Sequence, residues 1–169
     1  KPFTETDVCK PVSMYGKIKL ELENQILETH PNSIILRIAN PYGPLQGIKR
    51  EQGIVPVMMR RILNDEKITL YGNTIRDYFY IDDLIEAVWS VVTYQGSEKV
   101  FNIGSGTGRY LNDVRTDIET LLGKKGKVEH LPLRADDVLS NSLDVSLAQK
   151  ELGWKAATDW TTGLKNTYQ

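Results

Sequence analysis

The chain has 169 residues, of which 40% are hydrophobic and 25% are charged, and its formal net charge is −1. This composition excludes a disordered chain, because it supplies enough apolar surface to offset the entropy of ordering the backbone. Nucleic-acid binding normally requires a basic stripe, and the densest basic cluster here, GKKGK from Gly123, is short, so we predict no nucleic-acid partner.

The first elements are a long helix and a buried strand. We expect the helix over residues 13–30, where Ile18, Leu22 and Ile26 recur every fourth residue. Residues 33–40 are nearly all apolar, which predicts a strand buried on both faces, as in parallel sheets. Since one such strand cannot exist alone, the sequence implies partner strands that it does not contain.

Shorter strands and helices alternate over the rest of the chain. We expect a turn-rich loop at 40–47. We also expect a helix at 82–94, with Asp82 or Asp83 as its N-cap and one apolar stripe from Leu84 to Val92. The other expected helices are at 54–64, 110–123, 146–154 and from about 159, and the other strands at 67–72, 76–81, 99–103 and 127–133. Alternation of strands with helices indicates an α/β fold.

Tyr15 and Lys19 stand four residues apart near the start of the first helix. In a helix, such residues share a face, with Cβ atoms about 5–6 Å apart. A tyrosine pKa of about 10 is too high for a base at neutral pH, and a nearby ammonium group lowers it. The pair is therefore a candidate acid–base pair. In the alternative interpretation, Tyr15 packs and Lys19 pairs with Glu23.

Metal, disulfide and membrane signals are lacking. Cys9 is the single cysteine, so it forms no internal disulfide, and its spacing to His30 and His130 matches no zinc pattern. We therefore predict no metal site and a reducing compartment, the cytoplasm. No apolar run approaches the ~18 residues of a membrane span, so we predict no membrane partner.

A series of motifs resembles the C-terminal half of the extended short-chain dehydrogenase/reductase family, most of all its nucleotide-sugar epimerases, of which UDP-glucose 4-epimerase is the best-known type. In chain order, the motifs are YGKIK at Tyr15, RIANPYGP at Arg37, YGNTIRDYFYIDDL at Tyr71, FNIGSG at Phe101, LRADDV at Leu133 and ELGW at Glu151. The resemblance implies the C-terminal part of a Rossmann-type NAD(P)-binding fold in residues 1–45. It implies a small mixed α/β lobe for the nucleotide sugar, mainly in residues 46–169.

The resemblance also assigns cofactor and proton-transfer roles. Tyr15 and Lys19 match the Tyr-x-x-x-Lys of the family, in which the tyrosine takes a proton from a sugar hydroxyl while a hydride passes to NAD. The lysine binds the cofactor ribose and lowers the tyrosine pKa. Tyr42 is assigned with them to the cofactor. Asn40 matches an asparagine that contacts the sugar nucleotide, although a simple turn residue before Pro41 is the alternative.

Substrate-binding roles follow in the same way. Arg76 and Arg134 match arginines that bind the diphosphate, and two guanidinium forks suit phosphate oxygens well. Asp137 falls where the family has an aspartate that holds ribose hydroxyls. Tyr71 falls near the aromatic residue that packs on the base; its alternative is a plain strand aromatic. Asp136 departs from the family glycine and adds a negative charge beside the predicted phosphate site.

The Gly-rich turn that binds NAD in this family is absent. The turn at 104–108 lacks the G-x-G-x-x-G spacing, so we reject it as a dinucleotide site. The serine or threonine that assists the family tyrosine is absent too. We therefore expect that the N-terminal Rossmann half is missing and that the chain is a fragment without activity of its own.

For the parent protein, the sequence predicts NAD-dependent epimerisation at C4 of a UDP-hexose. The alternatives are a nucleotide-sugar 4,6-dehydratase, decarboxylase or reductase, or a non-catalytic nucleotide-sugar binding module. Family members commonly pair through the helix that carries the tyrosine, so a homodimer is expected. Polysaccharide biosynthesis is a common setting for such enzymes.

Overall fold

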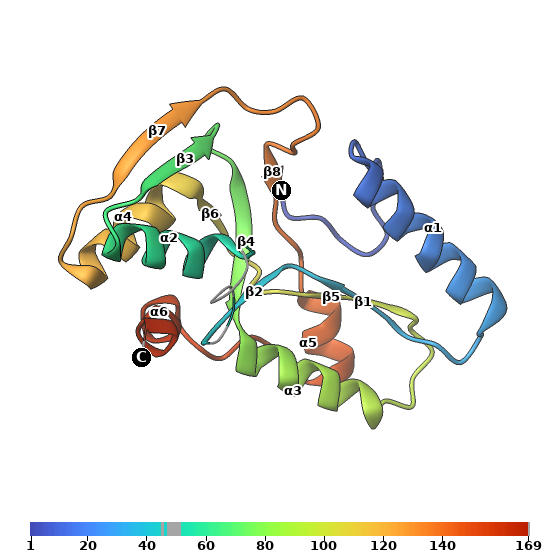
Figure 1. Cartoon of the computed structure of the whole chain (residues 1–169). Helices are drawn as coiled ribbons and strands as arrows, with labels where there is room; N and C mark the ends of the chain where they lie inside the picture. The colour runs from blue at the N-terminus through green and yellow to red at the C-terminus, as the bar shows by residue number, and fades with distance from the viewer. Residues whose placement is uncertain (45, 47–51, 169) are drawn as a thin grey trace.

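The computed structural model describes residues 1–44, 46 and 52–168, and it is an α/β fold. In chain order, its elements are α1 (Met14–Thr29), β1 (Ile35–Ile38), β2 (Asn40–Tyr42), α2 (Ile54–Leu63), β3 (Lys67–Tyr71), β4 (Ile75–Tyr80), α3 (Ile81–Val92), β5 (Val100–Ile103), β6 (Gly108–Tyr110), α4 (Leu111–Leu122), β7 (Lys127–Leu131), β8 (Ser140–Asn141), α5 (Ser146–Leu152) and α6 (Trp160–Tyr168). β1, β2, β4 and β5 run through the middle of the fold, and β3 and β7 lie at one edge (Figure 1). All predicted helices are present. The short strands β2, β6 and β8 were not predicted.

The segment expected to be one strand is two short strands that change partner. β1 pairs in parallel with β5, and β2 pairs in parallel with β4. Between them, the Ala39 N–H donates to the Ile103 carbonyl at 2.8 Å. The parallel pairing confirms the prediction, but burial on both faces was wrong: Ile38 is exposed and the rest of β1 is half-buried. The reason is that, within the described part of the chain, β5 is the sole strand beside β1.

β4 joins two hydrophobic cores, because successive side chains of a strand point to opposite faces. Tyr78 and Tyr80 belong to a first core that α2, α4 and α6 cover, whereas Phe79 belongs to a second core with Phe101 of β5 and residues of α3 and α5. The antiparallel β6 and the parallel β8 complete the pairing of β4, and β3 pairs separately with β7. Both cores contain residues from before and after position 45, and the predicted domain boundary there stays a prediction.

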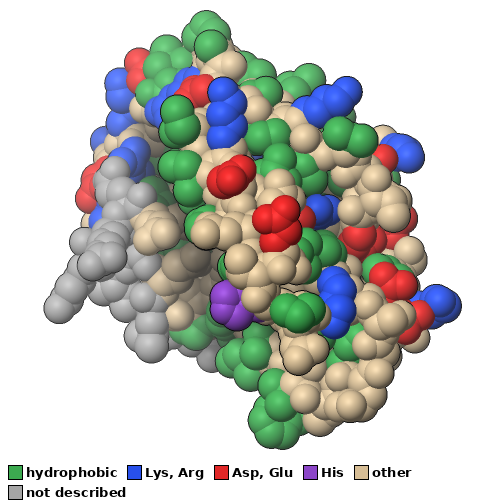
Figure 2. Space-filling model, turned by 90° about the vertical axis from the view of Figure 1, so that its right-hand side faces the viewer, with side chains coloured by type: hydrophobic (Ala, Val, Ile, Leu, Met, Phe, Trp, Pro, Cys, Tyr) green, Lys and Arg blue, Asp and Glu red, His purple; other side chains and the backbone are tan. Residues whose placement is uncertain are grey.

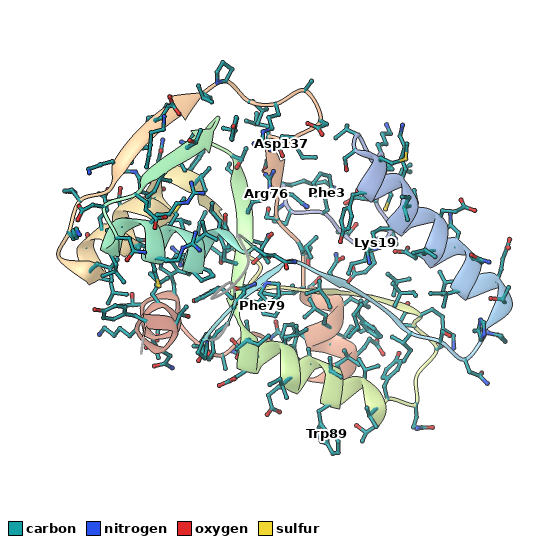
Figure 3. All side chains as sticks on the ribbon, viewed as in Figure 1. Phe3, Lys19, Arg76, Phe79, Trp89 and Asp137 are labelled. Carbon is teal, nitrogen blue, oxygen red and sulfur yellow. The ribbon has the colours of Figure 1, made fainter. Side chains whose placement is uncertain are left out.

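The apolar stripes predicted for α1 and α3 lie largely at the surface. Ile18, Leu22 and Ile26 of α1 are exposed, and the helix turns Leu20 and Leu27 inward instead. On α3, Leu84 and Val91 are half-buried, but Ile85, Val88 and Val92 are exposed. Trp89, on the same side of α3, points away from the body (Figure 3). Figure 2, which views the molecule from the α1 side, shows hydrophobic side chains mixed with charges of both signs.

The prediction that Asp82 or Asp83 caps α3 was wrong. The structure gives α3 no side-chain cap. Asp83 is buried and points elsewhere: its carboxylate accepts hydrogen bonds from the backbone N–H groups of residues 157 and 158, at 3.0 Å and 3.2 Å. Its backbone carbonyl accepts from the Trp154 indole at 2.9 Å. Asp83 thus fastens the segment after α5 to α3.

The Gly-rich turn between β5 and β6 wraps around a second buried carboxylate. Asp77 is fully buried, and its Oδ1 accepts from the Ser105 N–H at 2.8 Å and from the Ser105 hydroxyl at 2.6 Å. Its Oδ2 accepts from the Gly106 N–H at 3.1 Å. A Cβ atom on Gly104 would lie 2.5 Å from the same Oδ2, so only glycine fits there.

Among the helices that the structure describes, none is long and apolar enough to cross a membrane. Within the same residues, the His, Cys, Asp and Glu side chains form no group that could hold a metal ion. Cys9 is exposed and unpaired.

We predict that Asp77→Asn destabilises the protein by about 1–3 kcal/mol, because an amide presents N–H groups where the turn needs acceptors. Urea unfolding followed by circular dichroism measures this change. Asp82→Asn is the matched control, since Asp82 is exposed, and it should leave the unfolding midpoint almost unchanged. Equal midpoints for the two variants would contradict the structural role of Asp77.

Candidate functional site

A cleft of about 610 Å³ lies between α1, β2, α2, β3, β4 and the loop that follows β7. Its volume is in the range of small-molecule sites. Residues predicted for cofactor or substrate line it together, although they are far apart in the sequence: Tyr15, Asn40, Tyr42, Tyr71, Arg76 and Asp137. Lys19 and Arg134 lie just outside this lining.

Tyr15 stands in the first turn of α1, at the rim of the cleft. Ser13 caps the helix, its hydroxyl accepting from the Gly16 N–H at 3.1 Å. The Tyr15 side chain is 72% exposed, and the Lys19 ammonium nitrogen lies 5.6 Å from the centre of its ring. The structure therefore contradicts the alternative in which Tyr15 packs and Lys19 pairs with Glu23. The acid–base role stays a prediction.

Glu23 pairs instead with Arg37 of β1, and this pair holds α1 in place. Arg37 donates from Nε at 3.1 Å and from Nη2 at 2.5 Å to the two carboxylate oxygens, a bidentate and charge-assisted contact. Its Nη1 also donates to the Glu5 carbonyl at 2.9 Å. The hydrogen bond with Glu23 raises the pKa of Arg37 above its ordinary value. No residue of α1 is fully buried, so this ion pair adds to the contacts of the half-buried Leu20 and Leu27 in holding the helix that carries Tyr15.

Asn40 and Arg76 enter the cleft from adjacent strands. The Asn40 side-chain amide donates to the Asp77 carbonyl at 2.8 Å, which ties β2 to β4. Asn40 begins β2, so the alternative of a turn residue is wrong. Arg76 is largely buried; its Nη1 donates to the Ile75 carbonyl at 2.9 Å, and its Nη2 lies 3.9 Å from a carboxylate oxygen of Asp137. Both residues line the cleft, and Figure 3 shows Asp137 close to Arg76.

Arg134 and Tyr71 are stacked. The guanidinium carbon of Arg134 lies 3.7 Å from the centre of the Tyr71 ring, a cation–π contact. The two arginines predicted for the diphosphate therefore have different environments: Arg76 faces Asp137, and Arg134 covers an aromatic face. Their common role on a diphosphate stays a prediction.

Tyr42 and Tyr78 line the cleft but are mostly buried. The Tyr42 hydroxyl donates to the Trp160 carbonyl at 3.4 Å, and its ring meets the Trp160 ring edge-on with centroids 5.1 Å apart. Burial raises the pKa of Tyr42 well above its ordinary value and raises the pKa of Tyr78 to about 12. Both phenols therefore stay protonated at neutral pH. The cofactor contact predicted for Tyr42 stays a prediction beside this packing role.

Several lining residues were not predicted. Thr69 and Thr74 are polar groups of the cleft to which the sequence assigned no role, although Thr74 lies within the motif YGNTIRDYFYIDDL. Thr69 could have been found by alternation, because it stands two residues before Tyr71 on β3 and so shares its face. Thr74 lies in the turn before β4, where the sequence offers no periodic signal.

A second cavity of about 360 Å³ adjoins the cleft, since Ala39 and Asn40 line both. Lys19 and Gly16 of α1 line this second cavity. Together, Tyr15 and Lys19 offer the donors that a cofactor ribose would need. The Gly-rich turn does not suit the pyrophosphate of NAD, because the amides of Ser105 and Gly106 already donate to Asp77.

Residues 1–104 match the NAD dependent epimerase/dehydratase family, and the chain belongs to this family. The dTDP-4-dehydro-6-deoxyglucose reductase of Escherichia coli is 37% identical over 96% of this chain and 54% of its own length. A solved UDP-glucose 4-epimerase of Thermotoga maritima with UDP-glucose has a TM-score of 0.90 at 32% identity, over 99% of this chain and 56% of that one. The Thermus thermophilus UDP-glucose 4-epimerase in complex with NAD has a TM-score of 0.89 at 27% identity, over 99% and 57%.

The comparisons confirm the resemblance and the fold class. The chain matches the C-terminal part of the epimerase structures, and it spans about half the length of the curated relatives it matches. The relatives include a reductase as well as epimerases, so the family is shown at the level of nucleotide-sugar epimerases, dehydratases and reductases.

We predict that stability falls between about pH 10 and pH 12 because of Tyr78. Its folded pKa of about 12 exceeds the unfolded value of about 10, so its contribution is complete below pH 10 and is lost as the pH rises towards 12. Urea unfolding at about pH 9 and about pH 11.5 measures the loss. Tyr78→Phe should reduce the loss by about 1–3 kcal/mol, and an unchanged pH dependence in this variant would contradict the assignment.

Proposed function

We propose that the whole protein transfers a hydride to or from C4 of a nucleotide sugar with NAD as cofactor, and that its reaction is C4 epimerisation of a UDP-hexose. The observation that carries the proposal is the single cleft that Tyr15 of α1 shares with Tyr71, Arg76 and Asp137 of the other lobe. Family membership and similarity to the UDP-glucose 4-epimerase of Thermotoga maritima support it.

In this proposal, each part of the substrate has a protein partner. The base packs on Tyr71, the diphosphate binds the guanidinium groups of Arg76 and Arg134, and the ribose hydroxyls donate to Asp137. Because guanidinium groups bind phosphate oxygens bidentately, they fix the orientation of the substrate as well as its affinity.

The sugar end then lies towards Asn40 and Tyr15. The Tyr15 hydroxyl exchanges a proton with the oxygen on C4, and the Lys19 ammonium nitrogen lies 5.6 Å from the centre of the Tyr15 ring. The same Lys19, with Tyr15 and Tyr42, would hold the cofactor. When bound, NAD supplies the hydride acceptor and donor. The chain spans about half the length of the curated relatives it matches, so we expect the pyrophosphate of NAD to bind elsewhere in the whole protein and this chain alone to be inactive.

A second candidate is reduction of a 4-keto nucleotide sugar. The 37% identity to the Escherichia coli dTDP-4-dehydro-6-deoxyglucose reductase favours it. Both reactions move a hydride at one ring carbon, so the same tyrosine and lysine serve either. An epimerase interconverts UDP-glucose and UDP-galactose without net consumption of NADH, whereas a reductase consumes one NADH for each keto-sugar. A dehydratase, a decarboxylase and a purely binding module complete the set of candidate functions.

Dimerisation and location are further parts of the proposal. The exposed Ile18, Leu22 and Ile26 on α1 form an apolar stripe that supports pairing of two copies through this helix. The exposed, unpaired Cys9 supports a reducing compartment, the cytoplasm.

We predict that this chain binds UDP-glucose and that Arg76→Gln weakens binding about 10- to 100-fold, because one charge-assisted contact to the diphosphate is lost. Isothermal titration calorimetry measures the affinity. Lys155→Gln removes the same charge from an exposed position outside the cleft and should bind like the wild type. Equal affinities of the two variants would contradict the predicted diphosphate site.

In a full-length protein, we predict that Tyr15→Phe lowers kcat at least about 100-fold and leaves KM almost unchanged, since the hydroxyl acts mainly in the transition state. Coupled assays of UDP-galactose formation and of NADH-dependent keto-sugar reduction measure the rate and identify the reaction. Tyr168→Phe alters an exposed tyrosine at the end of α6 and is the control. Wild-type turnover by Tyr15→Phe would exclude the proposed proton transfer.

A further inference from the structure

The loop between β7 and β8, residues 132–139, is closed onto the cleft by two side chains. Arg134 lies on the ring of Tyr71, and Asp137 lies 3.9 Å from Arg76. Both project from one turn, in which the Asp137 N–H donates to the Arg134 carbonyl at 3.1 Å. A single segment therefore covers an aromatic ring and an arginine at the same time.

Both covered groups are those to which the proposed function assigns a ligand. A guanidinium group is planar and stacks on an aromatic face much as a nucleobase does. A carboxylate is an oxyanion and meets an arginine much as a phosphate does. The Arg134 guanidinium thus occupies the face of Tyr71 where a base would stack, and the Asp137 carboxylate lies near Arg76 where a phosphate would bind.

We propose that residues 132–139 are an internal competitor of the nucleotide sugar, and that binding exchanges the two contacts: the base displaces Arg134 from Tyr71, and the diphosphate displaces Asp137 from Arg76. This inference rests on the proposed function. It adds that the loop sets the affinity of the site, because the ligand must first break the contacts that the loop makes.

Backbone hydrogen bonds hold the two ends of the loop and leave its middle free to move. At one end, the Leu131 carbonyl accepts from the Gly72 N–H at 2.9 Å, and at the other, the Leu139 carbonyl accepts from the Ile75 N–H at 2.8 Å. Arg76, in contrast, belongs to β4 and is largely buried. The Asp137 side chain is 39% exposed, and an ion pair at 3.9 Å in contact with water is weak. The exchange therefore moves the middle of the loop and leaves the cleft wall in place.

The first test uses inorganic pyrophosphate, which has no ribose for Asp137 to hold. Titration calorimetry compares Asp137→Asn with Asp136→Asn, which removes the same charge from the adjacent, exposed position. We expect Asp137→Asn to bind pyrophosphate about 3- to 10-fold more tightly than Asp136→Asn. Equal affinities would overturn the competition at Arg76, because general electrostatics would then explain both variants.

The second test uses uridine, which has no phosphate for Arg134 to hold. Arg134→Ala should bind uridine about 3- to 10-fold more tightly than Val138→Ala, a truncation of another exposed residue of the loop, in titrations followed by NMR. Equal or weaker binding by Arg134→Ala would overturn the competition at Tyr71.

The outcomes also separate this inference from the proposed function. If UDP-glucose binds in an Arg76-dependent way but both comparisons show no difference, the nucleotide site stands and the competitor is rejected. If neither the wild type nor any variant binds UDP-glucose, pyrophosphate or uridine, both proposals are rejected.

Discussion

The buried carboxylate of Asp77 is the constraint on which the cleft depends. A buried charge is costly unless it is fully hydrogen-bonded, and here the donors come from the Gly-rich turn after β5. The backbone carbonyl of the same residue accepts from Asn40, so β2, β4 and the turn meet at one residue. Arg76, which precedes Asp77 on β4, is thereby held at a fixed position in the cleft wall.

An ion pair connects the strands next to Asp77 to α1, the helix that carries Tyr15. The bidentate pair between Glu23 and Arg37 joins α1 to β1, which in turn pairs with β5. The position of Tyr15 relative to Arg76 thus depends on polar contacts and strand register as well as on apolar packing of α1. An apolar core supports the other wall, where β4 directs Tyr78 towards α2 and α4.

Periodicity in the sequence predicted the helices well but not always their orientation. It located α1 and α3, yet their most regular apolar rows are exposed, because a repeat shows that a face exists and not what covers it. Asp83 looked like a helix cap because a cap is a local pattern, whereas its partners lie more than 70 positions further along the chain. The short strands β2, β6 and β8 were not predicted either, because each pairs with β4, which is distant in the sequence. The site residues were predicted through motif resemblance, and the structure adds that Arg134 stacks on Tyr71, a long-range contact that no local pattern encodes.

The exposure of Trp89 on α3 has a spectroscopic consequence. Its indole is 67% exposed, whereas Trp154 is buried and the Trp160 indole is hydrogen-bonded to Asp117 at 2.7 Å. Fluorescence of a solvated indole is red-shifted relative to that of a shielded one, so Trp89 should dominate the long-wavelength edge of the emission spectrum. Binding of another protein surface to α3 would bury Trp89 and shift that edge to shorter wavelength. Tryptophan fluorescence therefore reports on assembly through this helix.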